Sequence, residues 1–175
     1  MSDDQEIERV YLLARLPELP DHAEAWRLEQ GYLPEHDLAE GEARGDFAEG
    51  RVRKKVAPDG KTSYRHTIKR GAGLVREEIE REIDAAEFER NWGRTAGRRI
   101  SKTRYKVSEG ELTWEVDAFD DLPLVMAEVE LPSAETEVTP PAWLAPHVLR
   151  ELTEDSRYRN FALATRGLPD DHPGS

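Results

Sequence analysis

The chain of 175 residues contains no cysteine, which excludes disulfide bonds, thiolate metal sites and a cysteine nucleophile. It also lacks any apolar run long enough to span a membrane. Its first residues, MSDDQEIE, have neither the basic nor the apolar part of a signal peptide, so we expect a cytoplasmic protein. Apolar residues make up only 37% of the chain and charged residues 35%. We therefore expect some charged positions to be structurally organised rather than merely solvated.

The net charge of −12 argues against a DNA- or RNA-binding protein, because nucleic acids are bound by basic surfaces. It does not exclude a small anionic ligand, since clustered basic residues outweigh the net charge locally. Divalent metal ions could also bridge acidic side chains to phosphate groups. The five histidines show no metal-ligand spacing, so a zinc site is not expected. The expected partner is a small molecule, with neither nucleic acid nor a membrane involved.

Alternating apolar and polar residues, separated by turn residues such as Asp59-Gly60 and Glu109-Gly110, predict a set of antiparallel strands. Glu and Arg in residues 74–83 also favour a helix, and there the strand prediction depends on its context. The predicted strands are residues 6–13, 25–33, 51–56, 62–69, 74–83, 100–107, 111–118 and 124–131.

Asp84 predicts the N-cap of a helix over residues 85–92. Further helices are predicted over 142–151, after Pro140-Pro141, and over 155–164. The fold class is therefore α+β, an eight-stranded, mostly antiparallel closed β-barrel with a few flanking helices. We expect one domain over 1–165 and a disordered tail over 166–175. The polar residues 34–50 predict a long exposed loop, either a surface insertion or a flap over one mouth of the barrel.

Pairs of like charges separated by one residue recur in most predicted strands. Strand alternation places both charges of such a triplet on one face and the middle residue on the other. A single triplet is best explained by a solvated face, but their recurrence favours an organised charged surface. Which face is interior stays open, and a barrel with apolar residues outside would need helices or a partner subunit, as in a homodimer, to cover them. The triplets are Glu6-Ile7-Glu8, Arg51-Val52-Arg53, Glu78-Ile79-Glu80, Lys102-Thr103-Arg104, Glu115-Val116-Asp117 and Glu128-Val129-Glu130.

Several segments match, in order, a known family pattern: EIER at 6–9, EQGYL at 29–33, RVR at 51–53, TIKRGAGLVREEIE at 67–80, KTRY at 102–105, WEVDAF at 114–119, AEVEL at 127–131 and ELTEDSRYRNFALA at 151–164. Over nearly its whole length the chain resembles the CYTH family, the triphosphate tunnel metalloenzymes. The resemblance implies a tunnel of eight antiparallel strands, with charged side chains inside and a triphosphate lying along it. Ile7, Ile79 and Val129 would then face away from the tunnel.

The resemblance implies a hydrolase that depends on Mg²⁺ or Mn²⁺ and acts on a short linear triphosphate, with inorganic tripolyphosphate as the first candidate. Carboxylates suit these metals, and arginine offers a planar fork to phosphate oxygens. By resemblance, the metal ligands would be Glu6, Glu8, Glu128 and Glu130, with Glu78, Glu80 and Asp117 as further candidates. The phosphate-binding residues would be Arg51, Arg53, Lys69, Arg76, Lys102 and Arg104. The catalytic residues would be Glu8, Glu130, Lys69 and Arg53.

The chain departs from the family's Glu-x-Glu-x-Lys pattern at its last position, which is Val10. The change removes a cation from the strand face that carries Glu8. The enzyme could remain active through its other cations, with Arg15 or Arg157 compensating. It could instead act on another phosphorylated substrate, or bind a triphosphate with little turnover. Cyclisation of ATP and hydrolysis of thiamine triphosphate are further alternatives implied by the family.

Overall fold

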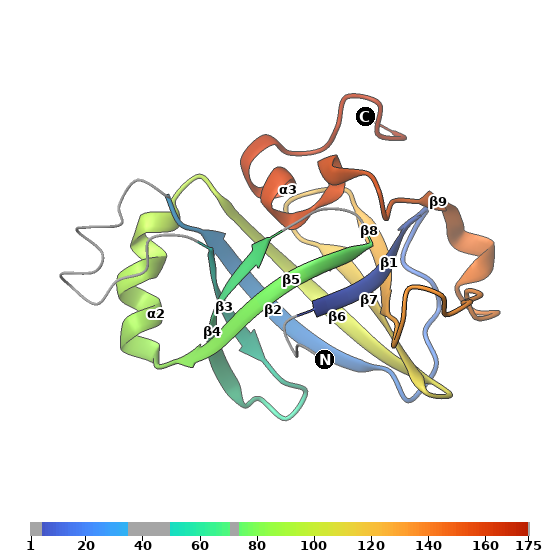
Figure 1. Cartoon of the computed structure of the whole chain (residues 1–175), viewed down its shortest axis with the longest axis horizontal. Coiled ribbons are helices and arrows are strands. Elements are labelled where there is room, and N and C mark those ends of the chain that lie inside the picture. Colours follow the sequence, from blue (N-terminus) through green and yellow to red (C-terminus); the bar gives the residue numbers. More distant parts are fainter. Residues whose placement is uncertain (1–4, 35–49, 71–73, 175) are drawn as a thin grey trace.

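The computed structural model describes residues 5–34, 50–70 and 74–174, without the side chains of Gln5, Lys69, Arg70, Arg76 and Glu77. One antiparallel sheet dominates this part of the chain (Figure 1). Its nine strands are β1 (Gln5–Leu13), β2 (Glu24–Tyr32), β3 (Arg51–Val56), β4 (Thr62–Arg70), β5 (Val75–Ile83), β6 (Arg99–Glu109), β7 (Leu112–Phe119), β8 (Val125–Glu130) and β9 (Val148–Glu151). The helices are α2 (Ala85–Trp92), α3 (Asn160–Arg166) and the 3₁₀ turns η2 (Gly93–Thr95), η3 (Ala145–His147) and η4 (Ser156–Tyr158).

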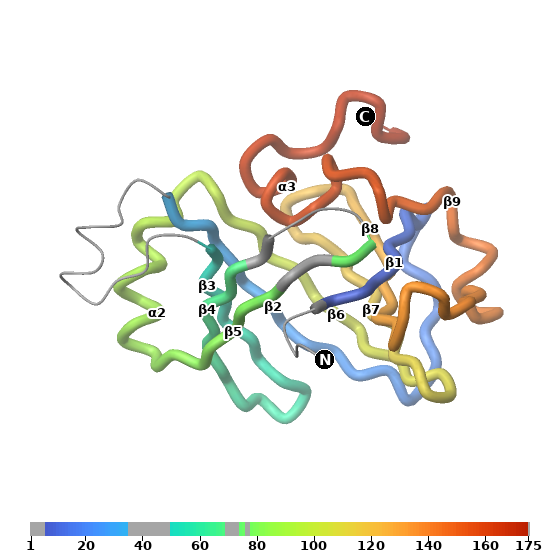
Figure 2. The backbone as a smooth tube through the Cα atoms, viewed as in Figure 1, coloured from blue at the N-terminus to red at the C-terminus, as the bar shows by residue number. Residues whose placement is uncertain are grey.

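The first strand holds the sheet in a tunnel-like form. The strand order is β5-β4-β3-β2-β6-β7-β8-β1-β9, and β1 also pairs with β5. The start of β1 lies against β5, with Glu6 opposite Arg76, whereas its remainder lies against β8, with Glu8 opposite Glu130. Strand β9 pairs with the end of β1, beyond the point where β5 has left it (Figure 2). The two ends of the strand series therefore meet at β1.

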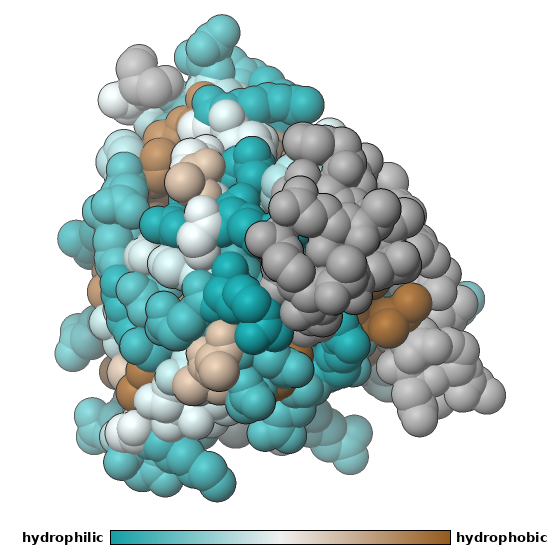
Figure 3. All heavy atoms as spheres, turned by 90° about the vertical axis from the view of Figure 1, so that its left-hand side faces the viewer, coloured by the Kyte–Doolittle hydropathy of each residue, from teal (hydrophilic) through white to brown (hydrophobic). Residues whose placement is uncertain are grey.

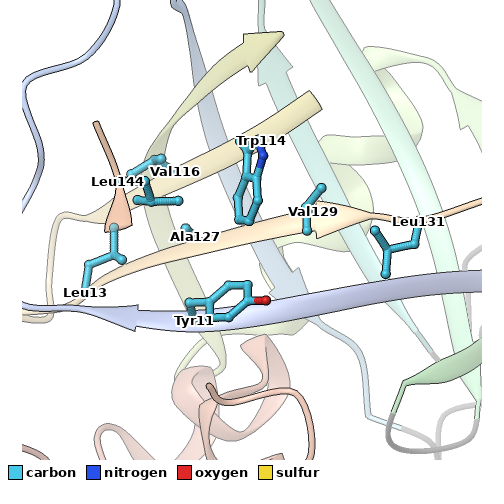
Figure 4. Packing of buried hydrophobic residues seen from close by; sticks show 8 residues of the cluster. All are labelled: Tyr11, Leu13, Trp114, Val116, Ala127, Val129, Leu131 and Leu144. Atoms are coloured by element: carbon cyan, nitrogen blue, oxygen red, sulfur yellow. The ribbon is translucent and has the colours of Figure 1, made fainter. Parts of the chain in front are cut away.

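The outer face of β1, β7 and β8 carries the largest apolar cluster, which Figure 4 shows. The chain that follows β8 covers it, contributing Leu144. Because side chains alternate along a strand, the residues next to these lie on the inner face. The cluster consists of Tyr11, Leu13, Trp114, Val116, Ala127, Val129, Leu131 and Leu144.

Two further apolar clusters lie at the two helices. Beside α3, inward residues of the sheet such as Leu12 and Met126 meet Leu152, Tyr158 and Leu163. Near α2, the second cluster comprises Leu33, Val52, Ile83 and Phe88. The predicted N-cap is confirmed: the Glu87 amide donates to Asp84 Oδ1 at 2.8 Å, and the Asp84 amide donates to Glu87 Oε2 at 3.3 Å. This capping box satisfies two otherwise unpaired amides at the start of the helix.

All eight predicted strands are confirmed to within two residues, including the ambiguous residues 74–83, which form β5. The predicted number of strands is one too few, because the helix predicted over 142–151 is wrong. This segment contains η3 and β9 instead. Pro146 would lack the amide proton and clash within a helix, and Val148–Glu151 pairs with the edge of β1. Most of the predicted loop over 34–50 lies outside the described residues.

The helix predicted over 155–164 is split into η4 and α3, since Arg159 has an extended backbone with φ of −71° and ψ of 150°. Residues 167–174, expected to be disordered, fold back after α3. Within them, His172 is only 8% exposed, and its Nδ1 lies 2.8 Å from the hydroxyl of Tyr158. The fold therefore continues beyond the predicted domain boundary.

The outer surface on the side of α2 exposes mainly hydrophilic residues (Figure 3). In the described part of the chain, no helix combines the length and the apolar composition needed to cross a membrane.

We expect Gly31→Ala to lower the free energy of unfolding by about 1–3 kcal/mol, because the added methyl group would overpack the contact between β2 and η2. A Cβ atom at Gly31 would lie 2.6 Å from the Cβ of Thr95. The Thr95 hydroxyl cannot move away easily, since it donates to the Trp92 carbonyl at 2.7 Å and accepts from Arg99 Nε at 2.9 Å. Urea unfolding followed by tryptophan fluorescence measures the effect. Gly93→Ala is the matched control, with no atom within 4 Å of the added Cβ, and equal losses in both variants would contradict this explanation.

Candidate active site

A cavity of about 540 Å³ lies within the curled sheet and is closed on one side by the segment around α3. Its volume is in the range typical of small-molecule sites. Eight carboxylate and five cationic side chains line it among the described residues, so the lining carries a net charge of −3. The carboxylates are Glu6, Glu8, Glu78, Glu115, Asp117, Glu128, Glu130 and Asp155, and the cations are Arg51, Arg53, Lys102, Arg104 and Arg159.

The register of the sheet explains why these charges converge. Arg104 lies opposite Asp117, and Glu8 lies opposite Glu130, and directly opposed residues share a face. The middle residues of the triplets behave as predicted. Ile7 and Val129 pack in or against the outer apolar cluster, while Ile79 is 42% exposed. The charged face of the sheet is therefore the interior one.

Asp117 is the most tightly held carboxylate of the cavity. Lys102 Nζ lies 2.7 Å from its Oδ2, and Arg104 Nε and Nη2 donate to its two oxygens at 2.8 and 2.9 Å. Burial alone would raise the pKa of Asp117, but Arg104 and Lys102 outweigh it and hold that pKa below its ordinary value. Burial lowers the pKa of Lys102, although Asp117 opposes this shift. Because cations occupy both its oxygens, Asp117 is less suited to metal binding than the other predicted ligands.

Arg104 connects two further carboxylates. Its Nη1 lies 3.1 Å from Glu115 Oε2, and its Nη2 lies 2.6 Å from Glu128 Oε1. Glu115 and Glu128 are directly opposed on β7 and β8, where like charges repel, so the guanidinium between them stabilises this pairing. Burial raises the pKa of Glu115 despite the nearby Arg104.

Among the described residues, fewer close carboxylates offset the positive charges of the two arginines of β3, Arg51 and Arg53. Arg51 is 6% exposed, and its buried Nε has no hydrogen-bond partner in the described part of the protein. Burial and the charges of Arg51 and Arg104 lower the pKa of Arg53 to about 9. Its carboxylate contact is long, 3.9 Å from Nη2 to Glu80 Oε2, and Glu80 also binds Arg65 at 2.9 Å. A buried cation with no close anion among the described residues is costly, so this part of the cavity favours a bound anion.

The opposite side of the cavity is acidic, with Glu6 and Glu8 on β1, Glu78 on β5 and Glu128 and Glu130 on β8. The direct opposition of Glu8 and Glu130 favours a cation between them. Carboxylate oxygens are the ligands that Mg²⁺ and Mn²⁺ prefer, so the donor chemistry fits these ions. No three acidic or histidine side chains are arranged together as a metal cluster among the described residues. Phosphate oxygens and water would therefore have to complete the coordination.

Comparison with known proteins agrees with this geometry. No protein-family model matches the chain. The inorganic triphosphatase of Nitrosomonas europaea is 40% identical to it over 165 residues, which cover 91% of this chain and 96% of that protein. The chain belongs to the CYTH family. An inorganic triphosphatase of Acetivibrio thermocellus is 42% identical over 66 residues, 37% of this chain and 40% of that protein.

Solved structures support the family membership. The crystal structure of an inorganic triphosphatase matches with a TM-score of 0.59 at 32% identity, and covers 94% of this chain and 97% of its own. A Pyrococcus horikoshii protein matches with a TM-score of 0.50 at 19% identity over 74% of this chain and 80% of its own. At that identity the second likeness concerns the fold alone.

Most of the site residues that the CYTH resemblance predicts line the cavity in the structure, but not all of them do. Glu80 is exposed and binds Arg65, outside the cavity lining. The side chains of Lys69 and Arg76 lie outside the described part of the chain. The register places these residues opposite Glu78 and Glu6.

Val10 lines the same cavity and packs against the apolar cluster beside α3. Its amide donates to Thr153 Oγ1 at 3.1 Å, and its carbonyl accepts from the Leu152 amide at 2.7 Å. The proposed compensation by Arg157 is not supported, because its exposed side chain binds Asp155 and Asp171 at 2.8 Å.

Sequence reasoning missed Arg159 and Asn160, which line the same cavity as Val10. Lys102 Nζ donates to Asn160 Oδ1 at 3.2 Å. Both residues lie within ELTEDSRYRNFALA, one of the segments that carry the family resemblance. Their position in this segment was the sequence signal that could have identified them as site residues. Arg159 therefore replaces Arg157 as the C-terminal cation of the candidate site.

We expect Asp117→Asn to lower the free energy of unfolding by about 3 kcal/mol, because it leaves Lys102 and Arg104 buried without their shared carboxylate. Urea unfolding at pH 7 measures this. The lowered pKa of Asp117 adds stability above its unfolded pKa of about 3.9 and loses it as the pH falls toward the folded value. The gap between wild type and variant should therefore narrow below about pH 4.

Asp120→Asn is the matched control, since Asp120 forms an exposed pair with Arg27 and such pairs contribute about 0–1 kcal/mol. If Asp117→Asn cost no more than Asp120→Asn, the central role of Asp117 would be refuted.

Proposed function

We propose that the chain hydrolyses a short linear triphosphate, inorganic tripolyphosphate in the first place, with Mg²⁺ or Mn²⁺ as cofactor. The observation that carries the proposal is the group of buried cations around Arg53, whose pKa of about 9 reflects burial and the neighbouring charges of Arg51 and Arg104. Two relatives named as inorganic triphosphatases support this choice of substrate.

In this proposal eight strands act as a closed tunnel along which the triphosphate lies. The pairing of β1 with both β8 and β5 supports it, since it joins the two ends of the strand series. Strand β9 would then lie outside the ring, on the edge of β1 that β5 leaves. The segment around α3 would close one end, which leaves the other end as the entrance.

Arg51, Arg53, Lys102 and Arg104 would bind the phosphate oxygens. Hydrogen bonds to charged groups contribute about 1.5–3 kcal/mol each, and the guanidinium groups match phosphate geometry. The protein has already buried these cations during folding, so a bound triphosphate would relieve their mutual repulsion. This arrangement favours an anion with several charged groups over a single phosphate.

The charge balance of the described lining favours metal ions beside a bound triphosphate. The described lining has a net charge of −3, and a triphosphate is itself multiply negative, so the two would repel without added cations. Glu6, Glu8, Glu78, Glu128 and Glu130 are the residues that would hold them. When bound, a divalent ion supplies positive charge to the phosphate oxygens and eases the deprotonation of water.

The reaction needs no side-chain nucleophile. A water molecule would attack a terminal phosphorus, the bridging P–O bond would break, and phosphate and pyrophosphate would leave. Glu8 and Glu130, which are cross-strand neighbours, would orient the water and accept its proton. Arg53, with Lys69 as the family resemblance implies, would offset the charge that develops on the leaving group.

We expect wild-type protein to release phosphate from tripolyphosphate only with Mg²⁺ or Mn²⁺, and Glu130→Gln to lower kcat/KM at least 100-fold, as loss of a group that stabilises the transition state commonly does. A colorimetric phosphate assay measures both. Glu111→Gln, in the exposed turn before β7, is the control with the same loss of charge and should retain wild-type rates. Metal-independent release, or equal rates in the two variants, would refute the proposed site.

Val10 favours the alternative of triphosphate binding with little turnover. Variants at Val10 and Arg159 distinguish this alternative from an active enzyme in which another cation compensates for the missing lysine. If Arg159 supplies the cation near Val10, Arg159→Gln lowers kcat/KM for tripolyphosphate at least 10-fold, whereas the neighbouring exposed Arg157→Gln has little effect. Val10→Lys then changes kcat/KM less than about 3-fold, because the cation is already present. A gain of 10-fold or more in Val10→Lys would instead indicate an active site weakened by the loss of lysine.

A further inference from the structure

A group of one aromatic and two basic residues lies outside the candidate active site. Lys55 Nζ is 4.7 Å, and Lys106 Nζ 4.4 Å, from the centre of the Trp26 ring. Trp26 is on β2, and the lysines come from β3 and β6, the two strands that flank it. None of the three residues lines the 540 Å³ cavity. The ring attracts both ammonium groups and holds them in one place.

These lysines continue the cations of the cavity. Arg51, Arg53 and Lys55 occupy alternate positions of β3, and Lys102, Arg104 and Lys106 occupy alternate positions of β6. Alternate strand residues share a face and are about 7 Å apart. The two rows therefore begin in the cavity and run toward the β3–β4 and β6–β7 hairpins, at the lower edge of Figure 1 and away from α3.

The charge at the end of these rows is poorly balanced. In the part of the chain that the structure describes, neither Lys55 nor Lys106 has a carboxylate within 4.0 Å. The residue opposite Lys106 is Glu115, which binds Arg104 at 3.1 Å. Burial, followed by the charges of Lys106, Arg53 and Arg65, lowers the pKa of Lys55 to about 8. An anion at this position would be stabilised by both ammonium groups.

We propose that Trp26, Lys55 and Lys106 form a mouth subsite, which binds the fourth and later phosphate groups of a linear polyphosphate whose leading groups occupy the cavity. The inference rests on the proposed function and extends its substrate class to longer chains. A repeating anion suits two rows of evenly spaced cations. A nucleotide base suits the subsite less well, because it would have to displace an ammonium group in order to stack on Trp26.

The test compares pentapolyphosphate with tripolyphosphate in the double variant Lys55→Gln/Lys106→Gln. We expect the ratio of kcat/KM for the longer to that for the shorter substrate to fall at least 10-fold. Lys54→Gln/Lys61→Gln removes the same charge from other positions of the β3–β4 hairpin and should leave the ratio unchanged. An unchanged ratio in Lys55→Gln/Lys106→Gln, or an equal fall in both double variants, would overturn the mouth subsite.

Trp26→Leu separates the two candidate occupants. If the ring only positions the lysines, its loss lowers the ratio of kcat/KM for pentapolyphosphate to that for tripolyphosphate about 3-fold and leaves ATP binding unchanged. If ATP binding weakens at least 10-fold in Trp26→Leu and stays unchanged in the double lysine variant, the subsite binds a base and the proposal is wrong.

Calorimetric titration keeps this test independent of turnover. If wild-type protein with Mg²⁺ or Mn²⁺ released no phosphate from tripolyphosphate, the proposed function would fail. The mouth subsite would still predict that wild-type protein binds pentapolyphosphate at least 10-fold more tightly than Lys55→Gln/Lys106→Gln does. Equal affinities would reject it.

Discussion

The buried contact of Asp117 with Lys102 and Arg104 is the constraint on which the interior depends. A sheet that turns its charged face inward has to offset the cost of removing those charges from water. Asp117 does so by accepting from two cations at once, across the pairing of β6 with β7. Arg104 extends the compensation to Glu115 and Glu128. Asp117, Glu115 and Glu128 are thereby engaged by the cations of β6, and among the described residues Arg51 and Arg53 have fewer close carboxylates.

Because the charged face of the sheet points inward, its apolar face has to be covered from outside. This arrangement explains how a chain with 37% apolar residues can still form a hydrophobic core. The chain after β8 covers β1, β7 and β8, where Trp114, Val116 and Val129 are fully buried. No described segment covers Ile79 of β5 in this way, and its side chain is 42% exposed. Hydrophobic burial is therefore concentrated on the strands that carry Glu8, Asp117 and Glu130, so the best-packed wall supports the most highly charged part of the cavity.

Local signals were sufficient for the eight strands and for α2, because turn residues, alternation and the Asp84 cap act over a few residues. They could not reveal β9, whose pairing depends on an edge of β1 that becomes available only where β5 ends. The same limit applies to the site. Strand register brings the triplet residues together, so alternation predicts them, whereas Arg159 and Asn160 reach the cavity only because the C-terminal segment folds across its end.

Val10 and the pair Lys55 and Lys106 lie at opposite ends of the charged path. At the end near α3, Val10 occupies the position where the family resemblance implies a lysine, and it joins the apolar cluster of Leu12, Met126 and Leu152. The apolar cluster beside α3 therefore extends along β1 as far as the inward position that follows Glu8. At the entrance, Lys55 and Lys106 lengthen the rows by one inward position each. The cations that remain in the cavity, together with Lys55 and Lys106 beyond it, form a continuous charged path along β3 and β6. A valine on β1 therefore does not by itself imply a lost function.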